Sequence, residues 1–273
     1  MSGAVERLKT RLVEKPWGRE NLPPPFSNPA RARIGEIWFE PPPAMPDLLV
    51  KYLFTSEKLS VQVHPSDETA LPGEAGKEEC WLVLDAEEGA GLAIGFDEPH
   101  ASETIAKAAR NGTIEQLLTW HKARSGDVFF LPPGTVHAIG PGLALVEVQQ
   151  TSDTTFRLYD YGRGRELHLE RALAVARCEP YPARHRGSID AMGPLVESAH
   201  FRFDRVAFGE GGPGIDEALR QAYGKGALVL PLEGFVKARE GGAAAGPGEC
   251  LYAPSLDALD FSAARTALLA RSL

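Results

Sequence analysis

Short runs of hydrophobic residues, each bounded by Gly, Pro or a charged residue, recur from residue 35 to residue 161. Most are four to eight residues long and rich in β-branched or aromatic side chains, which is typical of strands in β-sandwiches and barrels. We therefore predict a mainly β chain. The clearest runs are 35–40 (GEIWFE), 48–54 (LLVKYLF), 59–65 (LSVQVHP), 80–86 (CWLVLDA), 127–133 (DVFFLPP), 144–150 (ALVEVQQ) and 155–161 (TFRLYDY).

Two segments depart from this strand pattern and have helical spacing. In 102–121 the apolar residues recur at intervals of three and four, and Asn111-Gly112 interrupts them. This pattern predicts two short helices inserted between strands. Residues 167–176 predict one further short helix.

A change of composition after residue 178 suggests a second domain. Residues 179–194 contain three prolines and the basic cluster Arg184-His185-Arg186, a composition typical of a linker. Strand-like runs resume at 200–208, 226–238 and 249–255. We expect a catalytic domain over 1–180 with its helical insertion near 102–121, a linker over 181–195, and a smaller β domain over 196–273.

One short sequence occurs twice in related form. Residues 126–132 (GDVFFLP) and 248–254 (GECLYAP) share the form Gly, acid, four residues, Pro. A histidine, His137, follows the first copy, whereas no histidine follows the proline of the second. The simplest interpretation is a metal-binding barrel followed by a smaller relative without metal ligands.

Charge and cysteine content narrow the classes of partner and compartment. A formal net charge of −8 argues against a nucleic-acid partner, because phosphate backbones are bound by a basic face. Three distant cysteines without a CxxC motif fit a reducing compartment. The first 20 residues are charged throughout and no apolar run approaches membrane-spanning length. We expect a soluble cytoplasmic protein, a monomer or weak dimer with no membrane partner, whose charge does not exclude a small anionic substrate.

The segment 126–140 (GDVFFLPPGTVHAIG) points to a metal site. It predicts a strand, a Pro-Pro-Gly turn, and His137 where the next strand begins. Turn chemistry of this kind fixes the direction of a side chain, and imidazole is the commonest metal ligand in proteins.

Two upstream strands add further ligand-type side chains. Alternation along 60–65 (SVQVHP) places Ser60, Gln62 and His64 on one face and two valines on the other. The same alternation in 76–84 (GKEECWLVL) aligns Lys77 with Glu79. Two imidazoles, one carboxylate and one amide oxygen suit catalytic Zn²⁺, and also Mn²⁺, Fe²⁺ or Ni²⁺. The predicted ligands are Gln62, His64, Glu79 and His137.

In combination these motifs resemble a known family. The spacing Gly126-X5-Pro132-X-Gly134-X2-His137 matches the second cupin motif. Together with 15–18 (KPWG), 60–65, 76–90 and 149–161 (QQTSDTTFRLYDY), it resembles the type I mannose-6-phosphate isomerases in their short bacterial form. The resemblance covers most of 14–175, while the last third is similar only in a weak cupin character. It implies a cupin jelly-roll β-barrel with short helical insertions and a second, degenerate cupin-like β domain.

The resemblance also implies roles for individual residues. It implies one zinc ion per chain, bound by Gln62, His64, Glu79 and His137, with Arg157 as the catalytic arginine and Lys77 beside the metal. The Gln-X-His form of the first motif departs from the general cupin pattern His-X-His, and this departure is a feature of the isomerase family.

The implied reaction interconverts mannose 6-phosphate and fructose 6-phosphate through an enediol. It requires a base, and we predict Glu147, because a carboxylate inside an apolar strand has a raised pKa. Ser60, on the face of the predicted ligands, and Arg163, paired with Arg165 in 161–165 (YGRGR), are the predicted substrate-binding residues. Two other classes stay open: an Fe²⁺-dependent cupin dioxygenase, and a metal-dependent sugar-phosphate binding or regulatory protein without catalysis.

Overall fold

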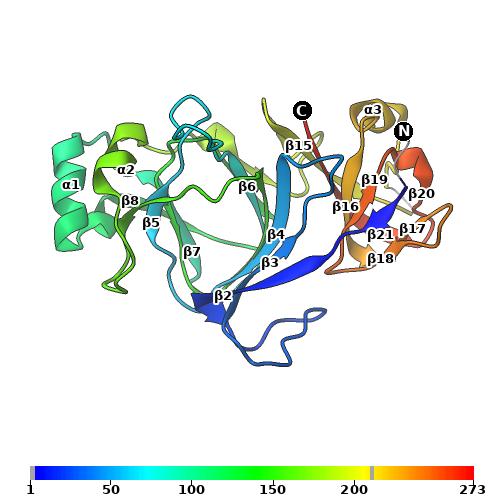
Figure 1. Ribbon diagram of the computed structural model, residues 1–273, viewed down its shortest axis with the longest axis horizontal. Helices are drawn as coiled ribbons and strands as arrows, with labels where there is room; N and C mark the ends of the chain where they lie inside the picture. Colours follow the sequence, from blue (N-terminus) through cyan, green and yellow to red (C-terminus); the bar gives the residue numbers. More distant parts are fainter. Residues whose placement is uncertain (1–3, 210–211) are drawn as a thin grey trace.

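The computed structural model describes residues 4–209 and 212–273, and within them β-strands predominate (Figure 1). The prediction of a mainly β chain is confirmed. The predicted ligands lie on, or directly after, strands of two sheets in the first part of the chain. The larger has the strand order β13-β9-β6-β11-β4-β3-β2, and the smaller has the order β12-β5-β10-β7-β8.

Each hydrophobic run between residues 35 and 161 coincides with a strand of these sheets, whereas the strands at 10–19, 91–96, 118–122 and 186–188 were not predicted. The larger sheet consists of β2 (Thr10–Arg19), β3 (Ile34–Phe39), β4 (Leu48–Phe54), β6 (Glu79–Ala86), β9 (Asp127–Leu131), β11 (Leu143–Gln150) and β13 (Arg186–Ser188). The smaller consists of β5 (Val61–Val63), β7 (Gly91–Phe96), β8 (Leu118–Lys122), β10 (His137–Ile139) and β12 (Phe156–Tyr159).

The carboxy-terminal part forms a six-stranded sheet, in the order β1-β19-β16-β21-β15-β14, and a three-stranded sheet, β18-β17-β20. Their strands are β1 (Glu6–Arg7), β14 (Val196–Glu197), β15 (Phe201–Ala207), β16 (Ala227–Gly234), β17 (Val236–Ala238), β18 (Ala244–Ala245), β19 (Leu251–Ala253), β20 (Leu259–Asp260) and β21 (Ala264–Ser272). Helix α3 (Glu217–Ala222) and a 3-10 turn at Leu256–Ala258 complete this part, while another 3-10 turn, Ala183–His185, contacts β9 of the larger sheet.

Every residue of β4 is buried, because both faces of the larger sheet are covered. Val50, Tyr52 and Phe54 pack with Phe203 and other residues of the six-stranded sheet. Leu53 points the opposite way, into a cluster between the larger and smaller sheets. The alternation of a strand therefore separates a structural face from a face that can line a site.

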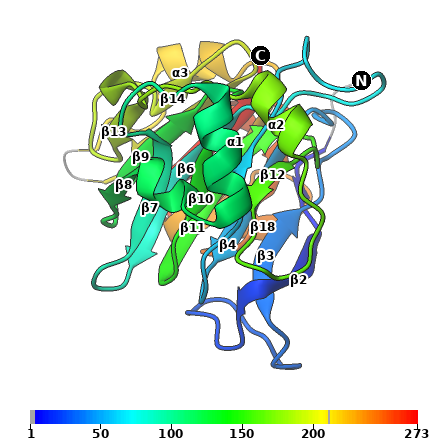
Figure 2. The same ribbon diagram turned by 90° about the vertical axis from the view of Figure 1, so that its left-hand side faces the viewer.

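The helices cover the outer face of the smaller sheet (Figure 2). Helix α1 (Ser102–Asn111) and helix α2 (Leu169–Val175) bury apolar side chains against that sheet, among them Ile105 and Ala172. The helix predicted within 167–176 is confirmed.

The first short helix predicted within 102–121 is confirmed as α1, whereas the second is only a short 3-10 segment and not the helix expected to extend toward residue 121. A 3-10 turn, Ile114–Leu117, leads directly into strand β8, which pairs antiparallel with β7. Pairing with β7, a contact distant in sequence, overrides the local helical spacing of the apolar residues.

The two halves of the chain share a strand order. The series β9-β6-β11-β4 in the larger sheet has the same sequential arrangement as β19-β16-β21-β15 in the six-stranded sheet. Strand β10, which begins at His137, corresponds in this arrangement to β20, which begins at the buried Leu259. An apolar side chain thus begins the strand where the first half has an imidazole.

The domain division at 181–195 stays a prediction. Within that range Arg186–Ser188 forms β13 and pairs with β9, while β1, near the start of the described chain, pairs with β19. No helix of the described residues has the length and apolar character needed to cross a membrane.

Candidate metal centre

Three buried side chains with metal-ligating atoms converge between the two amino-terminal sheets. One ligand atom from each of His64, Glu79 and His137 lies within 4.8 Å of the other two. The Nε2 atom of His137 is 3.3 Å from Glu79 Oε1, and the Nε2 atom of His64 is 3.6 Å from Glu79 Oε2.

Gln62 lies beside this group. Strand register places Gln62 directly opposite His137, and its amide nitrogen is 3.2 Å from His137 Nε2. Ser60 Oγ donates a hydrogen bond to the amide oxygen of Gln62 (3.0 Å). Rotation of the amide by a half-turn exchanges its nitrogen and oxygen, so Gln62 can present an oxygen to the same point.

The Pro-Pro-Gly turn before β10 positions two of these side chains. The backbone N–H of Gly134 donates to the carbonyl oxygen of His64 (2.8 Å), which ties the turn to the end of β5. Gly134 has a φ of +84°, and a Cβ at this position would lie 2.7 Å from the carbonyl oxygen of Val175. Only glycine fits the turn that aims His137 inward.

Backbone carbonyls orient both imidazoles. His64 Nδ1 donates to the carbonyl oxygen of Thr154 (2.8 Å), and His137 Nδ1 donates to that of Thr135 (2.9 Å). With Nδ1 protonated, each Nε2 presents its lone pair toward Glu79, as is usual for histidine ligands of metals. Burial lowers the pKa of both imidazoles, and for His64 the Lys77 ammonium lowers it further.

The donor set fits a divalent cation. Both oxygens of Glu79 are buried, and among the described residues neither accepts a hydrogen bond of good geometry. Burial opposes ionisation of Glu79, but Lys77, 3.1 Å away, and the two imidazoles outweigh it and lower the pKa of Glu79 to about 2. A buried carboxylate that faces two imidazole lone pairs could therefore hold a metal ion, and the amide of Gln62 lies beside it.

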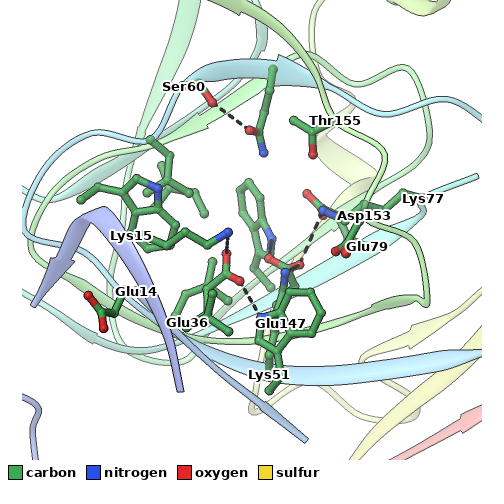
Figure 3. Close-up of a pocket in the computed structure, with 18 of the residues that line it drawn as sticks. Glu14, Lys15, Glu36, Lys51, Ser60, Lys77, Glu79, Glu147, Asp153 and Thr155 are labelled. Carbon is green, nitrogen blue, oxygen red and sulfur yellow. Dashed lines mark hydrogen bonds and ion pairs between the residues drawn. The ribbon is translucent and has the colours of Figure 1, made fainter. Parts of the chain in front are cut away.

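A cavity of about 540 Å³ opens in front of this cluster (Figure 3). It brings together most of the residues predicted from sequence: Ser60, Gln62, Lys77, Glu79, Glu147 and Arg157 all line it. The buried His64 and His137 lie behind this lining.

Arg163 is not among the residues that line the cavity. Its guanidinium donates to the carbonyl oxygen of Lys58 (2.7 Å) and lies 3.3 Å from Asp160. Arg165 lines the cavity instead, with two hydrogen bonds to Asp160 at 2.7 and 2.5 Å. Both arginines follow the end of β12 at Tyr159 and stand two residues apart, so strand alternation does not distinguish them.

Arg157 has an unusual environment for an arginine. Its Nε is buried and has no hydrogen-bond partner among the described residues. Burial lowers the pKa of Arg157, and the nearby Arg165 lowers it further. Asp160 and Glu166 oppose this lowering, but in the described part of the chain neither carboxylate lies within ion-pair distance of Arg157.

Glu147 lies in the wall of the cavity and is almost fully buried. Its Oε1 is 2.9 Å from Lys51 Nζ and 3.9 Å from Lys77 Nζ, and Trp81 Nε1 donates to its Oε2 (3.1 Å). Burial raises the pKa of Glu147 despite these cations, and the nearby Glu79 adds to that rise.

Three charged residues of this wall were not found from sequence. Lys51, Glu36 and Lys15 lie beside Glu147 in the cavity lining, where Lys51 pairs with Glu147 and Lys15 Nζ is 3.7 Å from Glu36 Oε1 (Figure 3). A lysine inside the apolar run LLVKYLF was the available signal, because a charge in a buried strand requires a partner.

Known proteins resemble this chain both in sequence and in fold. No profile of a known protein family matches the chain. The mannose-6-phosphate isomerase ManA of Bacillus subtilis (strain 168) is 43% identical over 168 residues, which are 56% of this chain and 53% of that protein. The mannose-6-phosphate isomerase of Streptococcus mutans is 44% identical over 136 residues, 47% of this chain and 43% of its own length. Over about half of its length the chain is similar to mannose-6-phosphate isomerases.

The predicted resemblance to that family is thereby confirmed, although the chain spans only about half the length of the curated relatives it matches. The crystal structure of the mannose 6-phosphate isomerase from Bacillus subtilis superimposes with a TM-score of 0.76 at 23% identity, covering 98% of this chain and 100% of that one. A putative mannosephosphate isomerase from Archaeoglobus fulgidus gives 0.77 at 18% identity, covering 99% and 98%. These matches confirm the predicted cupin fold.

Proposed function

We propose that the chain is a metal-dependent aldose–ketose isomerase that interconverts mannose 6-phosphate and fructose 6-phosphate in the cytoplasm. One observation carries the proposal: the cluster of His64, Glu79 and His137 lies behind a cavity that Lys77, Glu147 and Arg157 also line. Relatives named mannose-6-phosphate isomerase, at 43% and 44% identity, support the substrate.

A zinc ion held by Gln62, His64, Glu79 and His137 would act as a Lewis acid toward the oxygen on which charge develops. The donor set of two imidazoles, a carboxylate and an amide suits zinc, with manganese, iron or nickel as substitutes.

Glu147 is the proposed base that moves a proton between C2 and C1 of the open-chain sugar. Burial raises its pKa, and a base whose pKa approaches the working pH transfers protons efficiently. The hydrogen bond from Trp81 and the ion pair with Lys51 fix the carboxylate against the cavity wall. A proton taken from one carbon can then be returned to its neighbour by the same oxygen.

Arg157 and Lys77 are the proposed cations that stabilise the enediolate. Arg157 lines the cavity, and over the described residues its buried Nε has no hydrogen-bond partner, so this N–H can donate to the substrate. Lys77 lies between Glu79 (3.1 Å) and His64 (3.3 Å), beside the ligand cluster. Fixed cations in a site of low dielectric stabilise developing charge by several kcal/mol. Ser60 holds the amide of Gln62 and is the proposed hydroxyl contact to the substrate.

The proposal is tested by conversion of mannose 6-phosphate to the ketose, measured after chelation and again after restoring Zn²⁺. Arg157→Ala is expected to lower kcat by at least a hundredfold with zinc content unchanged, because one fixed cation at developing charge contributes about 3 kcal/mol. Arg171→Ala, which removes an exposed arginine from helix α2, is the matched control. Unchanged turnover in Arg157→Ala would exclude the assigned role.

The two alternative classes give different results in the same assay. A sugar-phosphate binding protein would bind hexose phosphate without exchanging solvent deuterium into C2. A cupin dioxygenase would contain iron and consume oxygen, and it would leave the cations at the cavity without a role.

A further inference from the structure

A continuous row of side chains crosses the cavity wall from the sheet edge to the proposed base. Arg11 of β2 is directly opposite Trp38 of β3, which is opposite Lys51 of β4. Lys51 is in turn opposite Glu147 of β11, which is opposite Trp81 of β6. All five residues line the cavity. The row therefore runs along the cavity wall from Arg11, on the edge strand of the sheet, to Glu147, the proposed base.

Arg11 is the outermost member of this row, and its charge is available to a ligand. Its guanidinium lies over the Trp38 ring, 4.4 Å from the ring centroid. Over residues 4–209 and 212–273 no carboxylate forms an ion pair with it, and its side chain makes no hydrogen bond. Stacking holds a guanidinium in place through its face and leaves the N–H groups at its edge free to donate.

Most other cations of the cavity have acidic partners. Lys51 pairs with Glu147 at 2.9 Å, and Lys77 pairs with Glu79 at 3.1 Å. Arg165 is held by Asp160 through two hydrogen bonds. Among the described residues that line the cavity, the two arginines without a carboxylate partner are therefore Arg157, beside the metal ligands in the proposed chemistry, and Arg11 at the opposite edge.

The separation between Arg11 and the base matches the length of a sugar phosphate. Strands β2 and β11 are three places apart in the sheet, which is about 14 Å at about 4.8 Å per strand. Because the guanidinium leans over Trp38, one strand nearer, it lies roughly 10 Å from the strand of Glu147. An extended hexose 6-phosphate has seven bonds from C1 to phosphorus and spans about 9 Å at roughly 1.3 Å per bond along the chain.

We propose that Arg11, held by Trp38, binds the phosphate group of the substrate and selects phosphorylated over free sugars. This inference rests on the proposed function, because it places C1 and C2 at Glu147 and the metal ligands. In this arrangement Arg11 contacts the substrate directly, and Trp38 is a positioning residue.

The test compares Arg11→Gln and Arg11→Lys with a matched control. Arg7→Gln is suitable, because Arg7 is an exposed arginine of the preceding strand that pairs with Glu249 outside the cavity. Isomerisation kinetics with mannose 6-phosphate and with free mannose are measured for each variant. The affinity for inorganic phosphate is measured separately by calorimetry, so that binding is followed without turnover.

For Arg11→Gln we expect KM for mannose 6-phosphate to rise at least tenfold, with kcat changed less than twofold. The affinity for inorganic phosphate should fall at least tenfold, kinetics with free mannose should not change, and Arg11→Lys should retain part of the phosphate affinity. Trp38→Leu should reproduce the KM effect, and Trp38→Phe, which keeps an aromatic face, should restore most of it.

Unchanged KM and phosphate affinity in Arg11→Gln would overturn the inference and leave the phosphate at the Arg157 end of the cavity. A lower kcat with an unchanged KM would also overturn it, because that result assigns Arg11 to the chemical step. If the wild-type protein binds phosphate through Arg11 yet does not isomerise mannose 6-phosphate, the proposed function fails while the phosphate site stands.

Discussion

Replacing Lys51 by methionine tests how the buried charges of the cavity wall are balanced. Lys51 Nζ lies 2.9 Å from Glu147 Oε1, and the two side chains are only 6% and 4% exposed. At an effective dielectric constant of about 20 their attraction is about 6 kcal/mol. Desolvation of two buried ions opposes most of this, so the intact pair contributes little net stability.

Removing one partner is a different case, because it leaves a buried charge uncompensated and typically costs about 3–5 kcal/mol. In the variant, Lys77, 3.9 Å from Glu147, still compensates part of the negative charge that Lys51 no longer neutralises. We therefore expect Lys51→Met to lower the free energy of unfolding at pH 7 by about 3 kcal/mol, at the lower end of that range.

Urea unfolding of the zinc-saturated protein, followed by tryptophan fluorescence, measures this loss. The double variant Lys51→Met/Glu147→Gln should be at least about 1 kcal/mol more stable than the sum of the single effects predicts, since contacting residues are coupled. Additivity of the single variants, or a loss below about 1 kcal/mol in Lys51→Met, would refute the reasoning.

The stability difference between Lys51→Met and the wild type should also depend on pH, in a direction that the structure predicts. Burial raises the pKa of Glu147 above 4.5, and Lys51 lowers it, so removing Lys51 raises it further. The folded variant then holds a proton that the unfolded chain has already lost. As pH falls through the raised pKa, the stability of Lys51→Met should approach that of the wild type, and a gap that widens toward low pH would contradict this explanation.

Three further outcomes follow from the structure. Chelation should abolish isomerisation and lower the Tm, and Zn²⁺ should restore both, because a ligand bound only by the folded state stabilises that state. A chelated protein with an unchanged Tm would argue against a metal at His64, Glu79 and His137. In the native protein only Cys178 should react promptly with a thiol reagent, because Cys80 and Cys250 are fully buried and burial raises the pKa of both thiols; mass spectrometry of the labelled protein checks this. Tyr223→Phe should lower the free energy of unfolding by about 1–3 kcal/mol, because the Tyr223 hydroxyl lies within hydrogen-bond distance of two buried acceptors, Asp204 and the carbonyl oxygen of Leu269. A urea midpoint equal to that of the wild type would contradict this prediction.

Local patterns in the sequence were sufficient to predict most strands and the convergence of the ligand side chains. Buried strands such as 48–54 and 144–150 are visible as apolar runs, and alternation predicts which side chains share a face. The fixed turn before His137 allowed its direction to be predicted as well.

Other elements were missed because their signals are not local. The strand β2 contains mostly exposed or half-buried residues, so its hydrophobic pattern is weak, and it is held by pairing with β3. The strand β8 has helical spacing and becomes a strand because β7 offers it a partner. In the same way, the choice between Arg163 and Arg165 depends on Asp160 and Lys58, not on the arginines themselves.

The sequence by itself determined the β class, the ligand types and the resemblance to mannose-6-phosphate isomerases, because these depend on residue identity and on spacing within single strands. Only the tertiary structure decided which charges neutralise one another. The row from Arg11 through Trp38 and Lys51 to Glu147 joins four strands by register, and register is set by packing between residues far apart in the chain. For that reason Lys51 pairs with Glu147 inside the wall, whereas Arg11, at the other end of the same row, forms no ion pair with any residue that the structure describes.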